Sequence, residues 1–169
     1  MRLMLALMTC AGLRREEAFG LMWEDIDFEE NLLNVQRAVV LPVDAPVVKE
    51  TKTGNTRMVP IPDDLLEVLL PIRRECGFVV LDKNDRQFTK SSYKKLWKAA
   101  KEIVGIPRLD ARVLRHSYAT YSASAGVEMK TLASCMGHTT MKTTFEVYTQ
   151  LDSTRLGAVR NMMSDYIKN

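Results

Sequence analysis

The sequence has few cysteines and no long apolar stretch, and each of these absences excludes a class of protein. Its three cysteines, Cys10, Cys76 and Cys135, are odd in number and show neither a CxxC pair nor the Cys/His spacing of a metal site. This argues against a disulfide framework or a zinc module and favours a reducing compartment with buried, inert thiols. The apolar opening, residues 3–8, is too short to cross a membrane and lacks the cleavage pattern of a signal peptide. We therefore expect a cytoplasmic protein in which this stretch is a core helix.

The sequence also has no internal repeats, no low-complexity segments and no carboxylate cluster of the kind that holds a catalytic metal ion. Asp25, Asp27, Glu29 and Glu30 follow one another on an acidic turn, so they do not suggest a divalent-ion nuclease. At 169 residues the chain is one domain by size, long enough for a core without metals or disulfides. We predict no metal and no cofactor.

Positive charge is concentrated in one part of the chain. Residues 86–115 contain nine lysines and arginines against Glu102 and Asp110, a net charge of +7, whereas residues 1–30 have a net charge of −4. A helix from Ser91 or Ser92 to Val104 would turn Tyr93, Trp97, Ala100 and Val104 inward. The same helix would carry Lys94, Lys98 and Lys101 as a stripe on its opposite side. Although charge runs are often only solvated surface, we predict that these three lysines contact nucleic-acid phosphates.

Two arginines, Arg112 and Arg115, stand one helical turn apart in a predicted helix over residues 111–125. The apolar face of this helix is predicted to be Leu114, Tyr118, Tyr121 and Ala125, and the arginines share another face. Guanidinium groups suit bidentate contact with a phosphodiester, and two without paired carboxylates require an external anion. Further along come a Gly-His pair at His138 and, ten positions later, Tyr148. The combination indicates a phosphate site with a nucleophile.

These motifs resemble those of the tyrosine recombinases, or phage-integrase family. The resemblance rests on Gly12-Leu13-Arg14 with Glu17, Lys52 before a Gly-Asn turn, Leu114-Arg115-His116, Met136-Gly137-His138 and Tyr148. Their order and spacing match nearly the whole chain. The resemblance covers the family's catalytic domain alone.

The resemblance implies a role for each residue of the motifs. Arg14, supported by Glu17, and Arg115 would hold the phosphate oxygens, and His138 would donate a further hydrogen bond. Tyr148 would attack the phosphorus and form a 3′-phosphotyrosyl link, and Lys52 would reach into the minor groove and protonate the 5′ oxygen. Arg57 and Pro60 follow Lys52 as in the family pattern, and we expect Arg57 to contact DNA.

Arg112 departs from the family, which usually has histidine three residues before the second arginine. That histidine is thought to help deprotonate the tyrosine. Arginine cannot accept a proton, so Arg112 could act only through its charge, on the tyrosine pKa or on the phosphate. His116 lies about 100° around the helix from Arg115 and is a poor substitute.

The pattern predicts a mainly α fold with a small antiparallel β-sheet, the fold of integrase catalytic domains. Helices are expected over residues 3–9, over residues 64–75 and over the lysine and arginine segments described above. Another should begin at residue 15 or 16 and turn Ala18, Phe19, Leu21 and Met22 inward. Three more are expected over residues 127–136, from Thr139 or Thr140 onward, and over residues 152–168. Asp63 is expected to cap the helix over residues 64–75, and Pro71 is expected to kink it. The buried side of this helix is predicted to be Leu65, Leu66, Leu69 and Ile72. Strands are expected at residues 32–36 and 38–40. Residues 47–51 and 56–61 are expected to pair as a β-hairpin with Lys52 beside its tip.

We expect residues 1–169 to be a catalytic domain and a fragment, because family members also carry an N-terminal core-binding domain and often an arm-binding domain. The resemblance implies double-stranded DNA as partner, a synaptic tetramer linked through the C-terminal helix, no membrane, and a bacterial or phage-encoded protein at the nucleoid that integrates a mobile element.

Three alternatives stay open. A type IB topoisomerase shares this site but releases supercoils, although Gly-His-Thr-Thr and the tail resemble recombinases better. A catalytically silent DNA-binding relative is argued for by Arg112 alone. A plain helical protein would have no role with nucleic acid.

Overall fold

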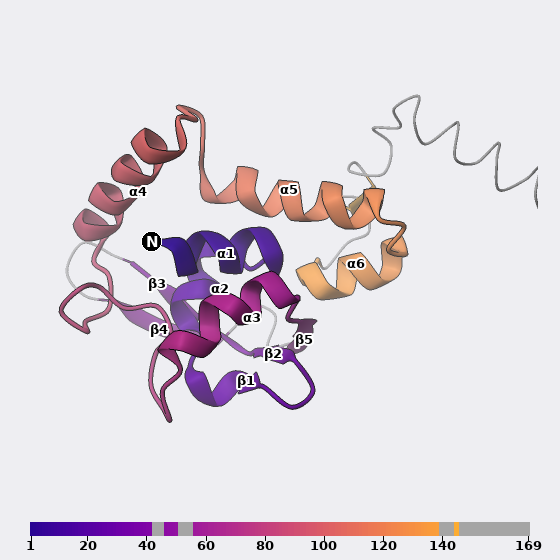
Figure 1. The fold of residues 1–169 in the computed structure, drawn as a ribbon, viewed down its shortest axis with the longest axis horizontal. Coiled ribbons are helices and arrows are strands. Elements are labelled where there is room, and N and C mark those ends of the chain that lie inside the picture. Colours follow the sequence, from indigo (N-terminus) through magenta and orange to yellow (C-terminus); the bar gives the residue numbers. More distant parts are fainter. Residues whose placement is uncertain (42–45, 51–55, 139–143, 146–169) are drawn as a thin grey trace, which may run out of the picture. The chain divides into compact units, whose positions relative to one another are not determined.

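The structure, a computed structural model, describes residues 1–41, 46–50, 56–138 and 144–145. The helices of this part are α1 (Arg2–Cys10), α2 (Arg15–Gly20), α3 (Asp63–Leu69), α4 (Lys90–Val104), α5 (Ala111–Ser124) and α6 (Met129–Met136) (Figure 1). Its strands are β1 (Ile26–Asp27), β2 (Leu32–Val35), β3 (Arg37–Val40), β4 (Val47–Glu50) and β5 (Arg57–Pro60), with 3-10 turns η1 (Trp23–Asp25) and η2 (Leu70–Ile72). The predicted mainly α fold with small antiparallel sheets is confirmed. None of the described helices is long and apolar enough to span a membrane.

The chain forms two compact units that divide within α5, the first being Met1–Tyr118 and the second beginning at Ala119. In the first unit, α1 packs against α2 and α3. Met4, Leu7 and Met8 of α1 are fully buried, so the apolar opening is a core helix as predicted. The helix ends at Cys10, and Gly12 then adopts a left-handed conformation with φ +62°. This turn leads directly into Arg14 and α2.

The strands pair differently from the prediction. β2 lies between β1 and β5 in one antiparallel sheet, whereas β3 and β4 form a separate antiparallel pair. The predicted hairpin between residues 47–51 and 56–61 is therefore wrong.

Burial explains the observed pairing. Val59 of β5 is fully buried opposite Leu33 of β2, in the core. The valines of β4 are 43% and 53% exposed, and they stand opposite Val39 and Val40 of β3 as β-branched cross-strand pairs. Lys52 falls in the connection between strands of different sheets, and it lies outside the described residues.

The helix after β5 is shorter than predicted. α3 begins at Asp63 itself, after Pro62, and η2 ends at Ile72. Pro71 has no N–H for a helical hydrogen bond, so the chain tightens into a 3-10 turn and stops. Ile72 is consequently 45% exposed, although it was predicted to be buried.

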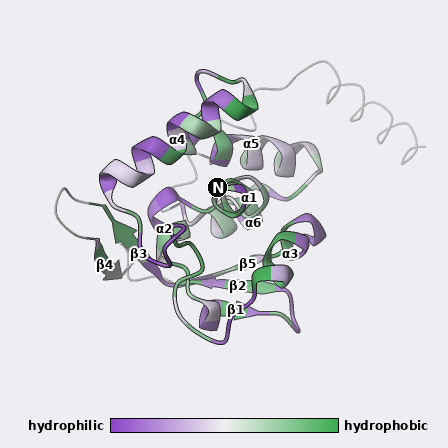
Figure 2. Ribbon diagram, turned by 60° about the vertical axis from the view of Figure 1, so that its left-hand side comes forward, coloured by the Kyte–Doolittle hydropathy of each residue, from purple (hydrophilic) through white to green (hydrophobic). Residues whose placement is uncertain are grey.

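The amphipathic character predicted for α4 is present (Figure 2). Trp97 and Ala100 are buried, and the Trp97 indole N–H donates to the carbonyl of Leu109 at 2.9 Å. Lys94 and Lys98 are exposed on the other side, and Lys101 is half-buried. Val104 was predicted to face inward but is 44% exposed, because it is the last residue before the left-handed cap at Gly105.

The buried side of α5 differs from the predicted apolar face. Leu114 is buried as predicted, but Tyr121 is 72% exposed and Ala125 is exposed. The other buried residues of this helix are Arg115, Ala119 and Ala123. A charged residue thus shares the buried side with two alanines, an arrangement that hydrophobic periodicity does not reveal.

Candidate active site

The site in the first unit is built around the carboxylate of Glu17, in the first turn of α2. Its Oε1 accepts from Nη1 of Arg14 at 2.8 Å and from Nη1 of Arg57 at 2.9 Å. Its Oε2 accepts from the backbone N–H of Arg14 at 2.8 Å and from Nη2 of Arg57 at 2.7 Å. The carboxylate therefore caps the start of α2, fixes the guanidinium of Arg14 and binds Arg57 in a bidentate pair.

Arg115 approaches the same carboxylate from α5. Its Nη1 lies 3.9 Å from Oε2 of Glu17 and donates a hydrogen bond to the carbonyl of Gly12. Gly12 also lies against the ring of Tyr118, because a Cβ added to it would stand 2.3 Å from Cδ1 of that ring. A glycine is required here by the left-handed backbone and by this close approach. The turn between α1 and α2 thereby orients both arginines that were predicted to hold a phosphate.

The exposed fractions of the side chains separate two kinds of arginine. The side chain of Arg14 is 41% exposed, whereas those of Arg57 and Arg115 are 9% and 11% exposed, and that of Glu17 is 4% exposed. Among the described residues, the three guanidiniums and the one carboxylate give this cluster a net charge of +2. An anion that enters beside Arg14 would offset this excess.

Electrostatics within the cluster shift two pKa values. Burial raises the pKa of Glu17, but the hydrogen bonds and charges of Arg57 and Arg14 outweigh it and lower the pKa to about 2. Burial and the charges of Arg14 and Arg57 lower the pKa of Arg115 to about 9, although Glu17 opposes them. Glu17 and Arg115 are therefore both charged at neutral pH.

Arg112 does not join this cluster. It lies on the first turn of α5, is exposed, and makes no hydrogen bond or ion pair with the part of the chain that the structure describes. The sequence predicted that Arg112 and Arg115 share one face of the helix, but in the structure Arg115 is buried and Arg112 is exposed.

The second unit holds His138. Helix α6 ends at Gly137, whose left-handed cap lets the backbone N–H of His138 bond to the carbonyl of Ala133 at 3.0 Å. The ring Nδ1 lies 2.8 Å from the hydroxyl of Thr144, which is fully buried. This contact fixes the orientation of the imidazole. Residues 144 and 145 are helical, as expected for the helix predicted from Thr139 or Thr140 onward, and Phe145 is 54% exposed.

Two predicted catalytic residues, Lys52 and Tyr148, lie outside the described residues, as does the predicted helix over residues 152–168. Arg14, Glu17, Arg57 and Arg115 come together as one cluster in the first unit. The predicted DNA contacts Lys94 and Lys98 are exposed on α4 and stay predictions.

Sequence reasoning missed the partnership of Arg57 with Glu17. Arg57 was predicted to contact DNA, but its guanidinium is buried against a residue 40 positions away. The only sequence signal was its place after Lys52 in the family pattern. The contact of Thr144 with the ring of His138 was not predicted either.

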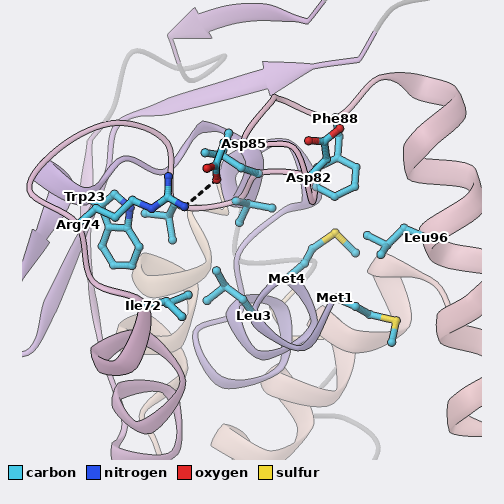
Figure 3. Close-up of a pocket in the computed structure, with 13 residues that line it drawn as sticks. Met1, Leu3, Met4, Trp23, Ile72, Arg74, Asp82, Asp85, Phe88 and Leu96 are labelled. Atoms are coloured by element: carbon cyan, nitrogen blue, oxygen red, sulfur yellow. Dashed lines mark hydrogen bonds and ion pairs between the residues drawn. The ribbon is translucent and has the colours of Figure 1, made fainter.

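The first unit also contains a cavity of about 260 Å³, lined by Met4, Trp23, Phe88, Leu96 and nine further residues (Figure 3). Arg74 and Asp85, at its lining, form a salt bridge of 2.7 Å. None of the residues of the Glu17 cluster lines this cavity, so it is separate from the predicted chemistry.

Solved structures of integrases share this fold. The Tn1549 transposon integrase in complex with circular intermediate DNA matches with a TM-score of 0.77 at 20% identity, over 94% of this chain and 58% of that one. The catalytic domain of bacteriophage HP1 integrase matches with a TM-score of 0.63 at 20% identity, over 94% of this chain and 79% of that one.

Curated relatives agree with the structures. A tyrosine recombinase XerC-like protein of Caldanaerobacter subterraneus subsp. tengcongensis is 30% identical over 83% of this chain and 43% of its own length. The tyrosine recombinase XerA of Saccharolobus solfataricus is 30% identical over 99% of this chain and 49% of its own length. The prophage integrase IntR of Escherichia coli is 30% identical over 82% of this chain and 40% of its own length. This chain thus spans about half the length of the curated relatives it matches.

The family model described as the Phage integrase family matches residues 1–155. That range contains the arginine cluster, the Gly-His cap of α6 and the predicted nucleophile. By this match, and by its relatives and fold, the chain belongs to the phage integrase family.

Proposed function

We propose that this chain is the catalytic domain of a tyrosine-type site-specific recombinase, which cuts and rejoins DNA strands through a 3′-phosphotyrosyl link. The observation that carries the proposal is the cluster of Arg14, Arg57 and Arg115 around the single carboxylate of Glu17. Its net positive charge and its preorganised donors suit the two nonbridging oxygens of a phosphodiester.

The chemistry is an in-line displacement at phosphorus. Arg14 and Arg115 hold the nonbridging oxygens, and His138, oriented by Thr144, donates a further hydrogen bond. The hydroxyl oxygen of Tyr148 bonds to phosphorus while its proton passes to solvent, and the bond from phosphorus to the 5′ oxygen breaks. Lys52 donates a proton to that leaving oxygen. The 5′ hydroxyl of a partner strand then attacks the phosphotyrosyl link and restores the tyrosine.

The substrate is double-stranded DNA, and the biological role is integration or excision of a mobile element. Two similarities support this role: the Tn1549 integrase holds circular intermediate DNA, and the Escherichia coli relative is named a prophage integrase. The exposed lysines of α4 supply contacts to the DNA backbone. We propose further that four copies assemble on DNA through the predicted C-terminal helix.

The test is covalent capture on a pool of nicked duplexes with randomised sequence, in which the cleaved strand loses the fragment needed for religation. The wild type should form an adduct that survives denaturant. Tyr148→Phe should form none while it still binds DNA, and the control Tyr121→Phe, at an exposed position, should form the adduct at the wild-type rate. An adduct with Tyr148→Phe would place the nucleophile elsewhere. No adduct with the wild type would favour the silent DNA-binding relative that Arg112 suggests.

The role of Lys52 has a separate test. Lys52→Ala should fail on ordinary DNA yet cleave a duplex whose 5′ bridging oxygen is replaced by sulfur, a leaving group that needs no proton. Without rescue by sulfur, Lys52 would be only a DNA contact.

A further inference from the structure

Arg57 is a buried partner of the catalytic cluster. It is the first residue of β5, where it stands opposite Val35 of β2, so its backbone is held by the sheet. Its side chain is 9% exposed, and its two terminal nitrogens donate to the two oxygens of Glu17 at 2.9 and 2.7 Å. A guanidinium held in this way has little surface left for the backbone of a DNA duplex.

Glu17 transmits this restraint to the arginines that would meet the phosphate. The oxygen that accepts from Arg57 at 2.9 Å also accepts from the guanidinium of Arg14, whose side chain is the most exposed of the cluster. The other oxygen accepts the backbone N–H of Arg14 and lies 3.9 Å from Arg115. Without Arg57, the carboxylate would lose two of its four hydrogen bonds.

We propose that Arg57 is a positioning residue: it fixes the Glu17 carboxylate so that Glu17 holds Arg14 toward the scissile phosphate, and it does not itself contact DNA. The inference rests on the proposed function. It gives β5, whose first residue is Arg57, a part in catalysis.

Loss of Arg57 should also change how the rate of adduct formation depends on pH. Burial raises the pKa of Glu17, and Arg57 is the strongest of the groups that lower it. Within residues 1–41, 46–50, 56–138 and 144–145, the charged groups that face Glu17 are Arg14 at the N-cap of its helix, Arg57 from β5 and Arg115 from α5. In Arg57→Met the effect of burial is less opposed, so Glu17 takes up a proton at higher pH and releases Arg14.

The experiment compares Arg57→Met, Arg57→Lys and the wild type by single-turnover adduct formation at saturating nicked duplex, from pH 4.5 to 8. Arg37→Met is the matched control. Arg37 is also a strand residue that forms a salt bridge with a buried carboxylate, that of Asp25, and this pair lies outside the cluster. The salt dependence of DNA affinity is measured for all four proteins.

We expect Arg57→Met to form the adduct about 100-fold more slowly than the wild type, with a further loss below about pH 6 that the wild type lacks. Arg57→Lys should regain roughly tenfold, because an ammonium supplies the charge but cannot bridge both oxygens. The salt slope should be unchanged in both variants. Arg37→Met should keep the wild-type rate and pH profile.

Several outcomes would overturn the inference. A salt slope reduced by about 1 in Arg57→Met with a normal rate would make Arg57 a DNA contact. If Arg37→Met slowed adduct formation equally, the effect of Arg57→Met would reflect a general loss of stability and not the positioning of Glu17. If Arg57→Met does not fold, Arg57→Lys decides alone, and a wild-type rate for it would contradict the inference. No adduct from the wild type itself would overturn the proposed function and this inference with it.

Discussion

Glu17 shows how one side chain can determine both the stability and the chemistry of the site. Its depressed pKa contributes stability that is fully present above the ordinary glutamate pKa of 4.5 and is lost as pH falls toward about 2. At pH 7 this contribution is about 3 kcal/mol. Removing the charge would take away the carboxylate that pairs with the buried guanidinium of Arg57 and lies 3.9 Å from that of Arg115.

Glu17→Gln should therefore lower the free energy of unfolding by about 3 kcal/mol at pH 7. The gap between the variant and the wild type should close as the pH is lowered from 4.5 toward 2, because the wild-type carboxyl then becomes neutral as well. Urea denaturation at several pH values measures this. The control Glu67→Gln, at an exposed position of α3, should change neither quantity. A constant gap across that pH range would show that the charge of Glu17 is not what stabilises the fold.

Arg112 carries a second prediction at the residue scale. It is exposed at the start of α5 and cannot accept the proton of Tyr148. Cleavage by the wild type should therefore accelerate from pH 7 to about pH 8.5, because more of the tyrosine is ionised as pH approaches its unperturbed pKa of about 10. Above that range Arg115, whose pKa is about 9, loses its charge. Arg112→His should raise the single-turnover rate near pH 7 and flatten this pH dependence. A histidine variant slower than the wild type at every pH would instead make the arginine an adapted part of the site.

The pairing of Arg14 with Glu17 was predicted from the family resemblance, and the structure shows the two side chains hydrogen-bonded at the start of α2. It could not predict the partnership of Glu17 with Arg57. A contact across 40 residues depends on which strands pair, and the sequence predicted a different partner for β5. Lys52 and Tyr148 keep the roles that the family resemblance implies.

Among the elements, the turn between α1 and α2 contacts two residues of α5, Arg115 and Tyr118. Gly12 contributes a left-handed backbone, a carbonyl for Arg115 and a surface for the ring of Tyr118. Gly12→Ala should destabilise the protein more than Gly105→Ala by about 1–3 kcal/mol. Gly105 has a similar φ of +71° but open space where a Cβ would stand, so its variant reports backbone strain alone.

Urea denaturation of the two alanine variants makes this comparison. Adduct formation should be slowed in Gly12→Ala only, because only that turn orients Arg115. Equal destabilisation of the two variants would mean that the ring of Tyr118 moves aside without cost.

The lysine stripe on α4 carries the second prediction at this scale. Replacing Lys94 or Lys98 with glutamine should reduce the slope of log K against log salt by about 1, because each lysine that contacts a phosphate releases counterions. Lys83→Gln, exposed on the turn before α4, is the control and should leave the slope unchanged. An unaltered slope for Lys94, Lys98 and Lys101 alike would mean that this side of α4 is turned away from DNA.

Helix positions were more predictable than their ends or the strand partners. The interior of α4 followed periodicity because Trp97 and Ala100 are spaced for one face, whereas its last residue, Val104, is exposed at the cap. The pairing of β5 with β2 depended on the burial of Val59 against Leu33, a tertiary property that local turn signals at Gly54 and Asn55 do not contain.

At the scale of the whole molecule, the proposed tetramer depends on the predicted helix over residues 152–168. The apolar side of this helix is predicted to consist of Leu156, Val159, Met163, Tyr166 and Ile167. Val159→Asp should abolish assembly into tetramers on DNA while covalent attachment by single copies continues. The control Asn161→Asp adds the same charge off that side and should assemble normally. Mass photometry of the protein on DNA distinguishes the two. Tetramers formed by Val159→Asp would show that another surface joins the copies.

The central claim is that this chain joins itself to DNA through Tyr148. The most direct measurement is mass spectrometry of the trapped adduct after digestion with nuclease and trypsin. We predict a 3′-phosphonucleotide on the peptide of residues 143–155, in which Tyr148 is the only tyrosine. A nucleotide on the peptide of residues 116–130, which contains Tyr118 and Tyr121, would contradict the claim, and so would an adduct with no modified tyrosine.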